Sequence, residues 1–326
     1  MSFAVGTALL AVVTALACAL PGVFVVLRKN SMLVDAISHA VLPGIVVGYF
    51  FSHNLDSPLL ILGAALAGLV VVLGSEWLSR TGLLTGDAPQ GLVFPALFSI
   101  GVILVTLNFA NVHLDTHAVL VGDLNLAAWH QFTVGGVSWG PVYLYVMLAV
   151  LLVNIAFLAL FYTRLKITTF DAQFAASLGI RPGLLNTVFM FLVSVTVTAA
   201  FNAAGAILVI ALVVVPAATA YLLTSRLPVM ILLTALVAVV GALAGFWIAY
   251  VLDAATSAGM SVFYGIVFVV ALLASKLLER QRRHRPKPHG REPAQFSGST
   301  QTASVADRPS ASDSSPPSTR TSTASE

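Results

Sequence analysis

Long apolar runs alternate with short polar breaks along most of the chain. Because a membrane-spanning helix needs about 20 predominantly apolar residues, the pattern predicts nine transmembrane helices, at roughly 2–27, 32–51, 58–79, 91–110, 141–163, 184–201, 203–224, 228–252 and 258–278. A tight turn at Asn202 would join the sixth and seventh spans. Residues 281–326 are rich in Ser, Thr, Pro and Arg, which predicts a disordered tail after a transmembrane domain of residues 1–280.

The composition agrees with this pattern. Hydrophobic residues make up 58% of the 326-residue chain and charged residues only 9%, compared with about 25% charged in a typical soluble protein. This excludes an ordinary soluble enzyme and favours an all-α polytopic membrane protein. Cys18 is the single cysteine, which excludes an intramolecular disulfide and a cysteine-rich metal site. No G-x-x-x-x-G-K-[ST] segment occurs, so any ATP would be bound by another subunit.

The distribution of charge predicts an orientation. With nine spans, all 16 Lys and Arg residues fall on the side of the C-terminus, whereas the opposite loops, 52–57, 111–140 and 253–257, contain none. The positive-inside rule therefore predicts a cytoplasmic C-terminus and an external N-terminus in a plasma (inner) membrane protein. Residues 1–275 contain 7 basic and 8 acidic residues, so the net charge of +3 comes from the tail. It indicates attraction to anionic lipid and no nucleic-acid partner.

Two ionisable residues lie inside the second predicted span. Asp35 and His39 are four positions apart, so both side chains project from one helical face. Ionisable groups in the membrane usually face a partner or a wet cavity. Carboxylate oxygen and imidazole nitrogen suit a divalent manganese, iron or zinc ion, but two ligands are too few for a closed site. The pair would thus contact a transported ion, with no permanently bound cofactor; a proton relay and a hydrogen-bonded structural pair are the alternatives.

A polar segment follows the fifth predicted span on the cytoplasmic side. Asp171 suits a helix N-cap and Gly179 a C-terminal stop, which predicts a short amphipathic helix between them. Phe174, Ala175 and Leu178 would share one face, and the small residues Ala175 and Gly179 would let another protein approach closely. The alternative is an interfacial helix lying on lipid.

The external loop between the fourth and fifth spans contains a third group. His113, Asp115 and His117 alternate along the sequence, and in an extended strand their side chains would share one face. They form a candidate cation-capture site. The alternative is a polar loop that contacts a docked protein.

Two stretches of sequence carry a family resemblance. The first runs from Leu27-Arg28-Lys29-Asn30-Ser31 through the D-x-x-S-H-A-V-L-P-G segment that begins at Asp35, and the second is T-F-D-x-x-x-A-x-x-x-G-I at 169–180, with V-P-A-A at 215–218. Over about residues 1–278 the chain resembles the integral-membrane permeases of metal-type ABC importers, which take up zinc, manganese or iron. The loop at 111–124 is similar to that of the manganese and iron branch.

The resemblance implies a mechanism and partners. Asp35 and His39 match the family's intramembrane metal-contacting pair, and Asp171, Ala175 and Gly179 match the helix that docks into a cytoplasmic ABC ATPase. An extracytoplasmic metal-binding protein would deliver a divalent metal ion, and a second permease chain, identical or homologous, would complete the pathway. The chain itself would be no enzyme. Two rival functions are an ABC permease for a siderophore or vitamin and an ion-gradient secondary metal transporter.

Overall fold

Membrane-length helices form most of the described chain. This computed structural model describes residues 3–53, 57–84, 86–108, 124–134 and 137–284. Nine helices in these ranges are long and apolar enough to cross a membrane, which confirms the predicted number. They are α1 (Phe3–Leu27), α2 (Ser31–Ser52), α3 (Pro58–Arg80), α4 (Ala88–Asn108), α7 (Val142–Phe170), α9 (Pro182–Ala204), α10 (Ala206–Leu223), α11 (Leu227–Val251) and α12 (Thr256–His284).

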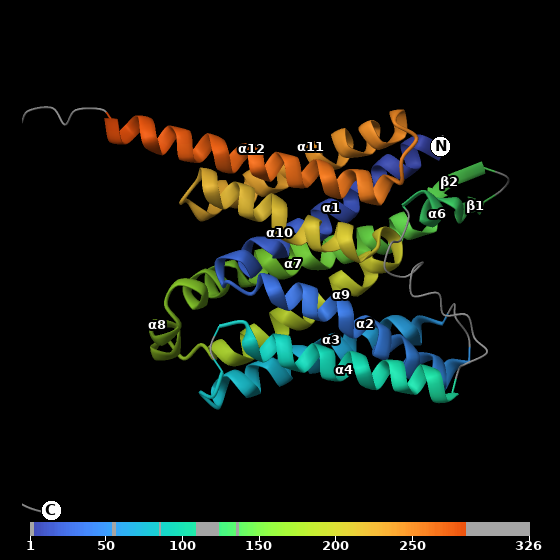
Figure 1. Cartoon of the computed structure of the whole chain (residues 1–326), viewed down its shortest axis with the longest axis horizontal. Helices are drawn as coiled ribbons and strands as arrows, with labels where there is room; N and C mark the ends of the chain where they lie inside the picture. Colours follow the sequence, from blue (N-terminus) through green and yellow to red (C-terminus); the bar gives the residue numbers. More distant parts are fainter. Residues whose placement is uncertain (1–2, 54–56, 85, 109–123, 135–136, 285–326) are drawn as a thin grey trace, which may run out of the picture. The chain divides into compact units, whose positions relative to one another are not determined.

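Helix α1 packs against four of the other membrane helices. This helix contacts α7, α9, α10 and α11, while α2 packs between α3 and α4, and α3 rests on α9 (Figure 1). The hydrophobic windows of α1 and α2 are each 67% buried, against 6% for α4 and 17% for α12. The chain therefore turns much of α4 and α12 toward lipid or another protein.

The two ends of the bundle carry different short elements. The short helix α8 (Ala172–Ser177) lies at one end, and α6 (Leu124–Trp129) lies at the other with strands β1 (Gln131–Val134) and β2 (Val137–Pro141) (Figure 1). The strands form an antiparallel hairpin. The apolar pattern predicted neither α6 nor the hairpin, because segments of four to six residues are too short to show a period. The all-α prediction is confirmed for the membrane helices.

Several boundaries differ from the predicted ones. Helix α7 has 29 residues, or roughly 43 Å at 1.5 Å per residue, so it extends well past the end predicted at residue 163. The break between α9 and α10 lies at Gly205 and not at Asn202, because Gly205 adopts φ 76° and ψ 165°, a conformation open mainly to glycine. Helix α12 continues to His284, past the end predicted at residue 278 for the ninth span.

Candidate functional site

Asp35 and His39 lie one turn apart on α2, as predicted. His39 Nε2 is 3.7 Å from Asp35 Oδ1, and the two side chains are 39% and 36% exposed, respectively. This distance is too long for a hydrogen bond, so the carboxylate and the imidazole do not satisfy each other. Both groups are left partly open on the surface of the single chain.

The His39 ring is held by aromatic side chains of α4. It stacks on Phe94 with ring centres 5.1 Å apart and an interplanar angle of 19°, and Phe98 approaches edge-on at 6.2 Å. Such packing restricts the imidazole to one orientation. In the described ranges, no third His, Cys, Asp or Glu joins the pair to make a metal-binding cluster. One chain therefore contributes two donor atoms, and an ion there needs further ligands from elsewhere.

Close backbone contacts fix α2 just beyond this pair. A Cβ atom on Gly44 would lie 2.5 Å from Gly63 O of α3, and a Cβ on Gly101 of α4 would lie 2.7 Å from Pro43 Cβ. Only glycine permits such approaches. Pro43 also lacks an N–H group, so the His39 carbonyl loses its usual helical donor four residues later. One turn from the candidate site, α2 is therefore packed closely against α3 and α4, and its backbone hydrogen bonding is locally weakened.

The short helix α8 begins and ends where the sequence predicted. Asp171 Oδ1 accepts a hydrogen bond of 2.8 Å from Phe174 N, and Gly179 adopts φ 77° after the last turn. The structure corrects the expectation that the small side chain of Ala175 faces another protein. Ala175 is fully buried where α8 contacts α7 and α9, so its small side chain lets α8 approach its own bundle. Phe174 and Leu178 are 53% and 55% exposed and form the outward face.

Arg28, in the first of the two family-like stretches, makes contacts that its sequence position did not predict. Its guanidinium is part-buried and hydrogen-bonded to α7 and α9. A basic residue placed directly between two transmembrane helices is common at membrane boundaries, so the sequence offered no signal for these long-range contacts. His113, Asp115 and His117 lie outside the described residues.

Comparisons with known proteins place the chain in a family. Residues 1–275 match the family described as "ABC 3 transport family". The zinc transport system membrane protein TroD of Treponema pallidum is 46% identical over 268 residues, which cover 82% of this chain and 72% of that protein. The manganese transport system membrane protein MntD of Bacillus subtilis is 39% identical over 275 residues, or 84% and 93% of the two chains.

A solved structure shares the fold. A chain of PsaBC from Streptococcus pneumoniae, solved in complex with Fab, superposes with a TM-score of 0.70, covering 86% of this chain and 96% of that one at 23% identity. Family match, relatives and nine apolar helices agree. This chain therefore belongs to the ABC 3 transport family and is a multi-pass protein of the plasma membrane.

Proposed function

We propose that this chain is the membrane permease of an ATP-driven importer for a divalent transition metal ion: manganese, zinc or iron. The observation that carries the proposal is the Asp35/His39 pair, which is part-exposed and aromatically braced inside a membrane helix. Relatives named for zinc and manganese transport support the cargo class.

The chemistry of the pair suits an ion in transit. One carboxylate oxygen and one imidazole nitrogen are ligands that first-row divalent metals accept. A site with only two protein ligands from one chain would leave the remaining positions to water or to another chain, which allows exchange. The metal is thus cargo, and no resident cofactor is proposed.

A second permease chain, identical or homologous, is proposed to cover this face. The hydrophobic window of α4 is only 6% buried, and α4 carries the two phenylalanines that brace His39. A partner chain packed there would enclose the pair and supply further ligands. An extracytoplasmic metal-binding protein is proposed to deliver the ion at the opposite end of the bundle from α8.

The energy of ATP hydrolysis is proposed to reach the permease through α8, which would dock on a cytoplasmic ABC ATPase. Asp171 caps this helix, Ala175 seats it on the bundle and Gly179 ends it, while Phe174 and Leu178 point outward. A short capped helix with an exposed apolar face suits insertion into a groove of another protein. The basic residues at this end of the bundle support its cytoplasmic placement.

Metal uptake tests the proposal. In cells that lack this gene, we expect wild-type protein to restore accumulation of manganese, zinc or iron, and His39→Ala or Asp35→Ala to reduce the initial rate at least about tenfold, equivalent to about 1.4 kcal/mol. His53→Ala is the matched control, since His53 caps the far end of the same helix.

Each rival function predicts a different outcome. Normal transport by both Asp35→Ala and His39→Ala would show that the cargo does not need this pair, as expected for an ABC permease of a siderophore or vitamin. Uptake into vesicles that lack the ATPase would instead indicate an ion-gradient transporter. Either result would reject the proposed function.

A further inference from the structure

Arg28 occupies the short connection between α1 and α2. Backbone hydrogen bonds of 3.0 Å from Lys29 N to Val26 O and from Asn30 N to Val25 O close this turn, and Lys29 adopts φ 58°. A connection this short and this fully hydrogen-bonded has little freedom. The start of α2 therefore follows any movement at Arg28.

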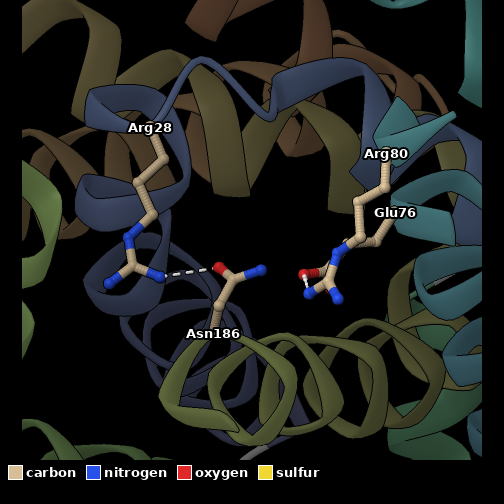
Figure 2. Close-up of polar contacts among 4 residues, drawn as sticks. All are labelled: Arg28, Glu76, Arg80 and Asn186. Atoms are coloured by element: carbon tan, nitrogen blue, oxygen red, sulfur yellow. Dashed lines mark hydrogen bonds and ion pairs between the residues drawn. The ribbon is translucent and has the colours of Figure 1, made fainter. Parts of the chain in front are cut away.

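The Arg28 guanidinium joins this turn to two other helices. Nε donates to Thr169 Oγ1 at 3.1 Å, and Nη2 donates to Thr168 Oγ1 at 3.2 Å, both at the end of α7. Nη1 donates to Asn186 Oδ1 on α9 at 2.8 Å (Figure 2). The guanidinium carbon also lies 5.1 Å from the centre of the Phe189 ring, within cation–π range.

The acceptors are oriented by their own helix. Thr169 Oγ1 donates to Leu165 O at 2.6 Å, and Thr168 Oγ1 donates to Arg164 O at 2.9 Å. Because each hydroxyl proton is directed into α7, the oxygen lone pairs are available to a donor outside it. The end of α7 is therefore built to accept the guanidinium.

The part-buried cation depends on these neutral acceptors. Burial lowers the pKa of Arg28 to about 10, which leaves the guanidinium protonated at neutral pH. Among the residues that the structure describes, no carboxylate forms an ion pair with it. A buried charge without an ion pair is costly unless its donors are satisfied. Movement of any one helix away from Arg28 would therefore be opposed.

The three acceptors flank α8 in the sequence. Thr168 and Thr169 directly precede Asp171, the N-cap of α8, and Asn186 lies near the start of α9, which follows α8 after a short connection. One side chain thus holds both the segment that enters α8 and the segment that leaves it. Its own backbone leads into α2, seven positions before Asp35.

We propose that Arg28 is a positioning residue that transmits a displacement of α8 to α2, the helix that carries Asp35 and His39. This inference rests on the proposed function, in which α8 receives the motion of the ATPase. Arginine suits the role because its donors are fixed in one plane, whereas a lysine presents a single ammonium on a flexible stem.

The test compares metal transport with ATP consumption. The transporter is assembled in proteoliposomes from this chain, its ATPase and its metal-binding protein, and both rates are measured. In Arg28→Lys we expect ATP hydrolysis to continue while the metal moved per ATP falls roughly tenfold, a typical size for coupling between sites. Thr168→Val combined with Thr169→Val should give a similar loss, and adding Arg28→Lys should give little more, because the residues act as one unit.

Arg80→Gln is the matched control. Arg80 lies at the same end of the bundle, but it donates to Glu76 one turn earlier on α3 at 2.7 Å, and its side chain is 70% exposed (Figure 2). It should keep the wild-type ratio of metal to ATP. A wild-type ratio in both Arg28→Lys and the double threonine variant, or an equal fall in Arg80→Gln, would overturn the inference.

Parallel loss of both rates at a constant ratio would also overturn it, because that is the result of less folded protein. The proposed function fails separately, if the wild-type assembly moves no metal with ATP.

Discussion

Two nitrogen-bearing side chains near the same end of α2 have different surroundings. His39 is part-exposed, braced by phenylalanine rings, and too far from Asp35 for a hydrogen bond. Arg28 is part-buried and hydrogen-bonded to three neutral oxygens. Exposure with incomplete hydrogen bonding suits contact with an ion, whereas hydrogen bonds from one side chain to two other helices suit the transfer of motion.

At the residue scale, the Asp171 cap gives a local prediction. Asp171→Ala removes the acceptor of Phe174 N, which should destabilise α8 by about 1 kcal/mol. Hydrogen exchange of the amides at 172–177 should therefore accelerate about fivefold. Asp171→Asn retains a good capping side chain and should exchange nearly as slowly as wild type. Equal acceleration in both variants would show that the cap does not hold the helix.

At the scale of elements, the position of α2 is set by backbone contacts with its neighbours. Gly44 and Gly48 face α3, where added Cβ atoms would meet backbone atoms of Gly63 and Leu59. Small residues allow helices in membranes to pack closely, where lipid offers no hydrophobic drive for association. The candidate metal pair therefore lies on a helix whose position is fixed by the close packing of its glycines against α3.

This packing predicts opposite effects for two glycine substitutions. Gly44→Ala would place its Cβ 2.5 Å from Gly63 O, so it should destabilise the chain by about 1–3 kcal/mol. Gly265→Ala on α12 meets nothing within 4 Å and should stabilise slightly, by about 0.5–1 kcal/mol, because alanine favours helix. Thermal unfolding in detergent measures both. Similar stability in the two variants would contradict the tight α2–α3 contact.

At the scale of the whole molecule, the separation of the two ends is the main feature for transport. Helix α8 lies at one end of the bundle, and the β1–β2 hairpin lies at the other (Figure 1). The basic residues 164 and 166 are on the part of α7 that leads to α8. The proposed importer needs this separation, because its cargo would arrive at one face and its ATPase would act at the other.

Thiol labelling tests the orientation. The native Cys18 is fully buried, so it should not react in the folded chain. A membrane-impermeant maleimide applied to intact cells should label Ala254→Cys, on the exposed turn between α11 and α12, and should not label Leu178→Cys. In inside-out vesicles the pattern should reverse. Labelling of Leu178→Cys from outside would invert the proposed topology.

Local sequence determined the elements that depend on local physics. Runs of about 20 apolar residues predicted nine helices, since a bilayer-spanning segment must satisfy its own backbone hydrogen bonds. Asp171 and Gly179 predicted both ends of α8, because capping is decided within one turn. The i, i+4 spacing placed Asp35 and His39 on one face for the same reason.

Only the tertiary structure decided which faces meet. Ala175 has the small side chain that suits an interface, yet the fold turns it toward its own bundle. Arg28 contacts residues about 140 and 158 positions away, and Phe94 reaches His39 from another helix. Neither the periodicity of apolar residues nor the spacing of residues along the sequence predicts such contacts, because they arise when separately formed helices pack against one another. The sequence alone thus determined the helices and the polar side chains that they carry. The packing decided which of these side chains stay exposed, as Asp35 and His39 do, and which are hydrogen-bonded to other helices, as Arg28 is.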